Sequence, residues 1–302
     1  MNSFLPEGKR SYNAAVGSYE GLKRAMERGD ILEAKALSCD QEHNLRVDLP
    51  GVRGVIPREE GALGIREGTV RDIALLSRVG RAVCFTVKDI ISEDNGLTAI
   101  LSRADAQQKC AEQYLSTLCP GDVIPACVTH LEPFGAFCDI GCGLVALMPI
   151  DAISVSRIEH PDERFTVGMD IFAVIKSIVG SRVTLSHKEL LGTWEENISR
   201  FAIGDTVTGV IRSIENYGAF VELAPNLAGL AELRDNIHVG DTAAVYIKSI
   251  LPQKMKVKLI IIDHFHEDRL PDAPEYYITE GHIEKFVYSP PDCGRIIETD
   301  FG

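Results

Sequence analysis

The chain has 302 residues, of which 45% are hydrophobic and 25% charged, and its formal net charge is -13. This length allows two to four small domains, and this hydrophobic content is typical of folded protein. No run of 18 apolar residues is present, which excludes a membrane-spanning helix. Residues 1–10 lack the apolar core of a secretion signal, so we expect a cytoplasmic protein with no membrane partner.

The acidic excess is unevenly distributed along the chain. Residues 264–302 carry 9 acidic and 3 basic side chains, whereas residues 200–263 carry 7 of each. Phosphate contacts need Lys and Arg, so bulk charge cannot drive binding to a polyanion, and any nucleic-acid binding must come from local faces and stacking. The eight cysteines are scattered, which indicates reduced thiols rather than a disulfide framework.

The first part of the chain predicts a helical leader and a degenerate barrel. Residues 19–28 predict an amphipathic helix that ends at Gly29 and completes the leader, 1–28. Short alternating stretches at 45–49, 54–57 and 100–103 predict strands of a first barrel over 29–106. Residues 104–118 predict a linking helix stopped by Pro120, which gives a helical linker over 107–119.

Residues 120–188 predict a five-stranded barrel. Alternation and glycine turns place strands at 123–128, 136–140, 144–148, 171–178 and 182–186, with a short helical segment from residue 149 to 157. A small sheet of closely spaced short strands favours closure, because closure removes exposed edges.

The same pattern returns 83 residues later. Phe134-Gly135-Ala136-Phe137 reappears as Tyr217-Gly218-Ala219-Phe220, and Gly121-Asp122 reappears as Gly204-Asp205. A linker, 189–200, therefore leads to a third barrel over 201–263, shortened because most of the helical insert is missing. In the acidic extension, 264–302, residues 276–278 and 286–288 suggest a hairpin. The chain is thus expected to be mainly β, with three tandem five-stranded barrels, a helical N-terminal segment and linkers.

Strand alternation places aromatic side chains on the outside of two barrels. Ala219, Val221 and Leu223 share the inward parity, which leaves Phe220 and Glu222 outside. Phe137 and Asp139 follow the same pattern. A bend at the preceding glycine brings Phe134 or Tyr217 to the same patch. With nearby cations, these rings would stack on single-stranded nucleic acid; the alternative is that they cover the barrel end or pack on a neighbouring repeat. The candidate cations are Lys176, Arg182, Lys248 and Lys256.

These stretches resemble the S-one domain, the oligonucleotide/oligosaccharide-binding (OB) barrel repeated in bacterial ribosomal protein S-one and present in several exoribonucleases and translation factors. The resemblance also includes the Gly-Leu steps at Gly143 and Gly229 and the stretch 182–188, and with the weaker first copy it covers roughly residues 29–263. It implies an OB fold for each barrel.

The family's RNA face uses two aromatics, a His on strand three, and an Asp and an Arg near strand five. By resemblance, Phe134, Phe137 and Arg182 fill three of these places in the middle barrel. In the third barrel, Tyr217 and Phe220 fill two, and Lys256 stands where the Arg is expected. The departures are Ala146 and Glu232 in the His places and Ile178 in an Asp place, and Glu232 would repel phosphate. The first barrel keeps none of the aromatics, which implies a docking or scaffold role.

The resulting functional interpretation is a non-enzymatic single-stranded RNA-binding protein, resembling a short ribosomal protein S-one, that acts in translation or mRNA handling with the ribosome as a further partner. The alternative is a scaffold that docks on the ribosome or another protein with little affinity for RNA. No catalytic motif, cofactor or metal is expected. His264 and His266 could bind a metal, but a solvated loop is the simpler reading. Cys138 and Cys142 have no second pair nearby and suggest buried thiols.

Overall fold

The computed structural model describes the chain except for residues 1–3, 11–13, 94–95 and 268–270. It is mainly β, with closed five-stranded barrels, as the alternation predicts. The chain divides into two compact units. The first contains residues 1–118 and 139–145, and the second contains residues 119–138 and 146–302. Among the described residues, no helix combines the length and apolar character that a bilayer crossing needs.

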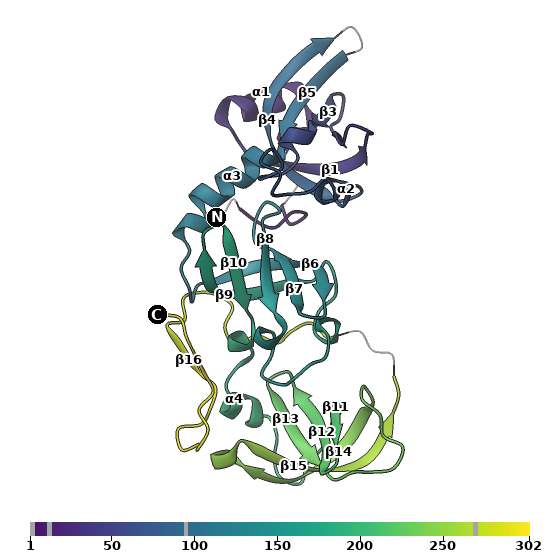
Figure 1. Cartoon of the computed structure of the whole chain (residues 1–302), viewed down its shortest axis with the longest axis vertical. Helices are drawn as coiled ribbons and strands as arrows, with labels where there is room; N and C mark the ends of the chain where they lie inside the picture. The colour runs from purple at the N-terminus through teal and green to yellow at the C-terminus, as the bar shows by residue number, and fades with distance from the viewer. Residues whose placement is uncertain (1–3, 11–13, 94–95, 268–270) are drawn as a thin grey trace. The chain divides into compact units, whose positions relative to one another are not determined.

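The barrel of the first unit has the strand order β1-β2-β3-β5-β4 (Figure 1). The parallel pair β3–β5 and the antiparallel pair β1–β4 complete the ring of strands. Its core includes Leu32, Leu45, Ile56, Phe85 and Leu101, all buried. The strands are β1 (Leu32–Cys39), β2 (Leu45–Val47), β3 (Arg53–Ile56), β4 (Ala82–Glu93) and β5 (Gly96–Ser102).

Helices precede and follow this barrel. Helix α1 (Tyr19–Arg28) begins at Ser18, whose hydroxyl accepts the Gly21 N–H, and it ends at Gly29 in the left-handed conformation. Helix α3 begins at Arg103, inside the range expected for the barrel, and its Arg103 guanidinium forms a buried two-point ion pair with Glu7. Helix α3 covers Arg103–Gln113, and the other helices described in this unit are η1 (Ala14–Gly17), η2 (Arg58–Glu60), α2 (Ile73–Leu76) and η3 (Leu115–Thr117).

The middle barrel has the strand order β10-β8-β7-β6-β9. Its five strands lie close to the predicted positions. They are β6 (Val123–Glu132), β7 (Gly135–Asp139), β8 (Val145–Pro149), β9 (Asp170–Val179) and β10 (Arg182–Ser186). The insert between β8 and β9 contains η4 (Ile150–Ala152) and η5 (Pro161–Glu163), and η6 (Lys188–Leu191) and α4 (Trp194–Ile198) follow β10.

The third barrel has the strand order β11-β12-β13-β15-β14, in which β13 and β15 are parallel neighbours and the antiparallel pair β11–β14 joins the two ends of the order. No helix lies between β13 and β14 in this fully described stretch, in agreement with the shorter repeat. The elements are β11 (Thr206–Glu215), β12 (Gly218–Ala224), β13 (Leu227–Ala231), β14 (Thr242–Leu251), η7 (Pro252–Lys254) and β15 (Lys256–Phe265).

The C-terminal extension is part of the second unit and contributes to its core. Phe286, Tyr288 and Phe301 join the core that contains the chain's single tryptophan, Trp194. A hairpin is present, but the prediction of its first strand is wrong. The paired strands are β16 (Lys285–Val287) and β17 (Glu298–Asp300). Residues 276–278 form no strand, because their groups serve other contacts: the Tyr276 hydroxyl accepts the Phe172 N–H, and the Tyr277 N–H donates to Leu190 O.

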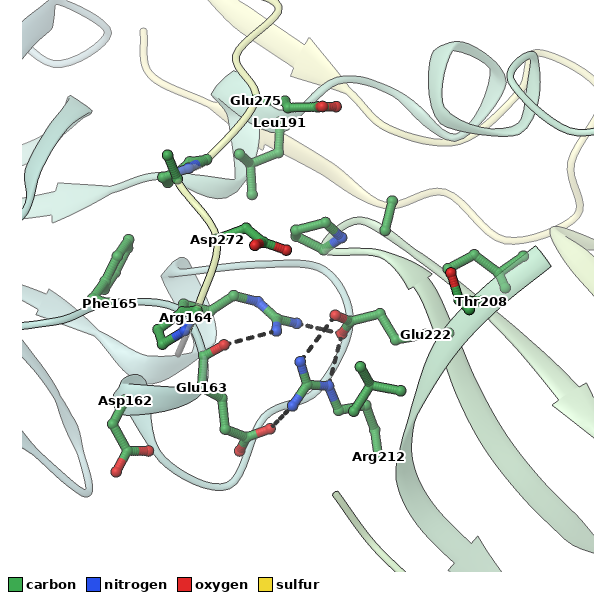
Figure 2. Close-up of a pocket in the computed structure, with 18 of the residues that line it drawn as sticks. Asp162, Glu163, Arg164, Phe165, Leu191, Thr208, Arg212, Glu222, Asp272 and Glu275 are labelled. Atoms are coloured by element: carbon green, nitrogen blue, oxygen red, sulfur yellow. Dashed lines mark hydrogen bonds and ion pairs between the residues drawn. The ribbon is translucent and has the colours of Figure 1, made fainter. Parts of the chain in front are cut away.

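A buried ion network connects the insert of the middle barrel with the third barrel (Figure 2). Glu222 on β12 contacts both Arg164 and Arg212, and Arg212 also contacts Glu163. The side chains of Arg164 and Glu222 are only 6% and 7% exposed. Glu222 was expected on the outer face beside Phe220, in solvent. The insert covers that part of the face and turns an outward charge into a buried one.

The Glu222→Gln variant should unfold more easily, because the change leaves two arginines without their shared anion. Breaking a buried ion network of this kind costs about 3–5 kcal/mol. Urea unfolding followed by Trp194 fluorescence measures it. The matched control is Glu232→Gln, which removes an exposed carboxylate 3.9 Å from Lys248 and should change stability by less than about 1 kcal/mol. Equal effects of the two substitutions would contradict a structural role for the network.

A second prediction concerns His187, which is buried with its Nδ1 against Ile153 O and its Nε2 against the Tyr276 hydroxyl. Burial lowers the pKa of His187 from 6.5 to about 4. Between these values the unfolded chain binds a proton that the folded chain does not, so stability present above pH 6.5 is lost as the pH falls to 4. The loss should reach about 3 kcal/mol.

Urea titrations at pH 7 and pH 4.5 test the role of His187. The variant His187→Gln keeps a side-chain donor and acceptor but cannot titrate, so its stability should depend less on pH than that of the wild type. His130→Gln, a change at an exposed histidine, should leave the wild-type dependence intact. A His187→Gln variant with the full wild-type dependence would assign the acid sensitivity to other groups.

Candidate nucleic-acid interface

The first aromatic platform lies at the start of β7. Phe134 and Phe137 meet edge to face, with ring centroids 5.9 Å apart. Phe134 is 56% exposed and Phe137 half-buried, so one ring supports the other. His130 on β6 adds a third ring, which stacks on Phe137 at 6.1 Å and an interplanar angle of 28°. We use "first platform" for His130, Phe134 and Phe137.

The second platform repeats this geometry with two rings. Tyr217 and Phe220 meet edge to face at 6.2 Å, and Tyr217 is 68% exposed. On β11, Ser213 is the partner of Phe220 in the strand register, and it is the equivalent of His130 in the 83-residue repeat. His130 was not among the predicted residues, because the two copies share no residue type at this position. The feature that could have indicated it is the position of His130 on the outward side of a strand next to Phe137.

The glycine inside each aromatic motif allows the rings to approach. A Cβ atom at Gly218 would lie 2.5 Å from Ala231 O, and one at Gly135 would lie 2.3 Å from Met148 O. These distances are far shorter than a van der Waals contact, so a side chain would push apart the strands that carry the platforms. The motif therefore needs glycine for close approach as well as for the bend.

Most inward residues agree with the predicted alternation, but two residues expected on the outside, Asp139 and Glu222, are buried. Ala136, Cys138, Ala219 and Val221 are fully buried in the barrels. Asp139 was expected outside beside Phe137, but it is 2% exposed. Its carboxylate accepts the N–H groups of Gly141 and Gly143, so its role is to close the turn rather than to face a ligand. Leu223 is only partly buried but packs against the core.

Three lysines lie on the outer face of the third barrel. Phe220 pairs with Leu230 on β13, and Leu230 pairs with Lys258 on β15, which places all three in one row of the sheet. Lys258 is exposed and was not among the predicted residues. Lys256 is exposed two residues earlier on the same strand. Lys248 is exposed at the irregularity between Ile247 and Ser249, where β14 runs beside β15.

The middle barrel has fewer cations on the corresponding strands. Lys176 is half-buried in the same kind of irregularity on β9, and Arg182 is exposed at the start of β10 opposite Val179. Thr184 pairs with Leu147 and occupies the place that Lys258 has in the third barrel. The structure therefore divides the features unequally: the middle barrel has more rings, and the third barrel has more lysines.

Ala146 and Glu232, the two residues in the place of the family's histidine, lie in different surroundings. Ala146 is buried in the barrel core, so the outward residue of β8 at this level is Leu147. Glu232 is exposed beyond the end of β13, where it lies 3.9 Å from the Lys248 ammonium group and offsets part of its charge. In the first barrel, the turn before β2 is polar and is closed by Asp40, which accepts the N–H groups of Glu42 and Asn44.

A cavity of about 960 Å³ lies in the second unit beside the ion network (Figure 2). Arg164 and Arg212 line it, but both already contact Glu222. Acidic residues from the insert and the C-terminal extension add negative charge to its wall, among them Asp162, Asp272 and Glu275. This chemistry does not suit a phosphate group, which leaves the aromatic platforms as the better candidate for RNA.

The histidines and cysteines singled out in the sequence have structural settings. His264 lies within β15 rather than in a loop, and the Nδ1 atoms of His264 and His266 lie 3.4 Å and 3.2 Å from the buried Asp241 carboxylate. Cys138 and Cys142 are buried thiols, as expected, and none of the eight cysteines forms a disulfide.

Comparison with protein families supports the middle barrel directly. Residues 118–187 match the model of the RRP5 S1 domain. This segment contains all five strands of the middle barrel and the complete first platform. The S1 domain is the S-one type that the motifs resemble.

Comparison with curated proteins extends the relationship over most of the chain. Small ribosomal subunit protein bS1 of Staphylococcus aureus (strain COL) is 33% identical over 259 residues, which cover 83% of this chain and 63% of that protein. The bS1 protein of Staphylococcus haemolyticus is 31% identical over 262 residues, with 83% and 62% covered. The chain thus spans less than two thirds of the length of these relatives.

Among solved structures, a multidomain protein with nucleic acid binding domains from Streptococcus pneumoniae covers 78% of this chain and 74% of its own, at 12% identity and a TM-score of 0.25. A score this low adds nothing to the assignment, which rests on sequence. The match identifies residues 118–187 as an S1-type domain, and most of the chain is similar in sequence to bS1, as the repeated motifs predict.

Proposed function

We propose that this protein binds single-stranded RNA on the two aromatic platforms and acts in translation or mRNA handling. The observation that carries the proposal is the repeated edge-to-face pair, in which a half-buried ring supports a ring that is 56% or 68% exposed. An exposed ring held in place can stack on any base, because every base has a π-face. The relatives named as small ribosomal subunit proteins support the ribosome as a further partner.

The proposal assigns different roles to three tandem OB-type barrels, over residues 29–106, 120–188 and 201–263. The middle barrel contributes mainly stacking, through Phe134 and Phe137 with His130. The third barrel contributes Tyr217 and Phe220 with a larger share of phosphate contacts. The first barrel lacks the aromatic pair and serves as a scaffold. No step of this function requires catalysis, since stacking and charge are sufficient for holding a strand.

The cations have the supporting role of contacting the RNA backbone. Three lysines lie on adjacent strands of the third barrel: Lys248, Lys256 and Lys258. Since Phe220 and Lys258 lie in one row of the sheet, a nucleotide whose base stacks on Phe220 would have its phosphate near Lys258. Lys176 and Arg182 have this role on the middle barrel. The net charge of -13 opposes general attraction of a polyanion, so we expect modest affinity concentrated on these faces.

The stacking role predicts that the double variants Phe134→Ala/Phe137→Ala and Tyr217→Ala/Phe220→Ala each weaken RNA binding by about tenfold or more, since base stacking contributes about 1–3 kcal/mol per base. Fluorescence anisotropy with a short labelled single-stranded RNA and the full chain measures this. Tyr19→Ala, which removes an exposed aromatic ring from α1, is the matched control and should bind normally. Wild-type affinity in both double variants would overturn the platforms as the binding surface and favour the protein-docking alternative.

The charge contribution has a separate signature in salt. Replacing Lys248, Lys256 and Lys258 by Gln should reduce the slope of log K against log[salt] by about 2, because each phosphate contact to a single strand contributes about 0.7. The exposed lysine of the C-terminal hairpin, Lys285, is the control, and Lys285→Gln should leave the slope unchanged. An unchanged slope in the triple variant would mean that these lysines do not reach phosphate.

A further inference from the structure

Three metal-binding residue types converge where the C-terminal extension meets the start of the middle barrel. The carboxylate of Asp122, the thiol of Cys119 and the imidazole of His282 each offer one ligand atom, and these atoms lie within 4.8 Å of one another. His282 comes from a segment 160 residues away from Asp122 in sequence. The three groups belong neither to the aromatic platforms nor to the ion network.

The third barrel shows what this turn does without a metal. There, Asp205 Oδ2 accepts the Ala202 N–H at 2.7 Å, just as Asp122 Oδ2 accepts the Cys119 N–H at 2.8 Å. Asp122 is therefore explained by the turn alone. In the 83-residue repeat, however, the place of Cys119 is taken by Ala202. The thiol is an addition that the turn does not require, and it is exposed rather than part of the core.

The backbone brings His282 to the same point. The Val123 N–H donates to Gly281 O and the Ile283 N–H donates to Gly121 O, which places His282 directly opposite Asp122. A Cβ atom at Gly121 would lie 2.3 Å from Ile283 O, whereas one at Gly204 in the other copy would have no neighbour within 4 Å. The close approach of the extension thus depends on Gly121. The extension places the His282 imidazole beside this turn and not beside the equivalent turn at Gly204.

The interatomic distances are close to those of a tetrahedral site. Cys119 Sγ lies 3.4 Å from Asp122 Oδ2 and 3.9 Å from His282 Nδ1, and His282 Nδ1 lies 2.8 Å from Asp122 Oδ1. Tetrahedral zinc with one sulfur ligand at about 2.3 Å and nitrogen and oxygen ligands at about 2.0–2.1 Å has ligand–ligand distances of about 3.3–3.6 Å. The two distances to Asp122 involve different oxygens, and with one ligand atom from each residue the three atoms lie within 4.8 Å of one another. Side-chain shifts of about 1 Å would therefore complete the geometry.

From this geometry we propose that Cys119, Asp122 and His282 bind a divalent transition metal of the zinc class. Sulfur, nitrogen and oxygen together suit Zn²⁺, whereas Mg²⁺ and Ca²⁺ prefer oxygen alone. On binding, the Cys119 thiol transfers its proton to solvent and the thiolate becomes a ligand. The side chains of His282 and Asp122 are 42% and 22% exposed, which gives the ion an entry path and leaves a fourth position for water. The bound ion fastens the C-terminal extension to the barrel.

Titration of the full, chelator-treated chain with Co²⁺ tests the site, because a thiolate ligand gives a sulfur-to-cobalt charge-transfer band. We expect this band to saturate at one equivalent and to disappear on addition of Zn²⁺. Cys119→Ala should abolish the band. His282→Gln should weaken metal binding by about tenfold or more, because mutating even a residue that only hydrogen-bonds to a ligand lowers metal affinity by about 10- to 100-fold. Cys293→Ala changes a half-buried cysteine of the C-terminal extension that is not part of the proposed site, and it should behave as the wild type.

Stability provides an independent readout. Zn²⁺ should raise the unfolding midpoint of the wild type, followed by Trp194 fluorescence, and should not raise that of Cys119→Ala. This variant keeps the turn, since alanine occupies the same place in the third barrel, and its Trp194 signal verifies that it is folded. The proposal is overturned if the wild type gives no charge-transfer band or if Cys119→Ala binds as tightly as the wild type. Loss of binding in His266→Ala alone would place the ion at the Asp241 cluster instead and would also overturn it.

Discussion

The alternation of side chains along the second strand of each barrel is the constraint on which the candidate interface depends. Ala136 and Cys138, and likewise Ala219 and Val221, fill the interior of a small closed sheet. Because neighbouring residues of a strand point to opposite faces, Phe137 and Phe220 have no place inside. Each ring must then find support on the outer surface, and the glycine before it allows Phe134 or Tyr217 to supply that support. An exposed aromatic surface is the direct result of filling the core.

The two copies have diverged around this shared constraint. In the middle barrel, His130 enlarges the aromatic surface, and the helical insert sends Arg164 and Glu163 toward β12 of the next barrel. In the third barrel, Lys258 on β15 stands where the middle barrel has Thr184, and Glu222 belongs to the buried network. A charge that would repel phosphate beside Phe220 is thereby neutralised. The same repeat unit thus has a more aromatic outer face in one copy and a more cationic outer face in the other.

Much of the fold follows from local patterns. Strand positions in the middle barrel, the end of α1 at Gly29 and the absence of a helix between β13 and β14 all depend on alternation, glycine and spacing, which are properties of neighbouring residues. The errors share a cause. Asp139 and Glu222 have outward parity, but parity does not say what covers a face, and in both cases other groups exclude solvent. The prediction of the first hairpin strand is wrong because Tyr276 and Tyr277 form hydrogen bonds with Phe172 and Leu190, which are distant in sequence, and not with the expected partner strand at 286–288.

The sequence by itself therefore determined the repeat, the mainly β character and the exposed aromatic pairs, because each is written in residues that lie within a few positions of one another. Only the tertiary structure decided which residues from distant segments meet. In the tertiary structure, Lys258 lies in the same row of the sheet as Phe220, and Arg164 contacts Glu222. His282 lies beside Asp122 and Cys119. These juxtapositions arise from strand register and from the packing of the C-terminal extension. Neither has a signature in local periodicity.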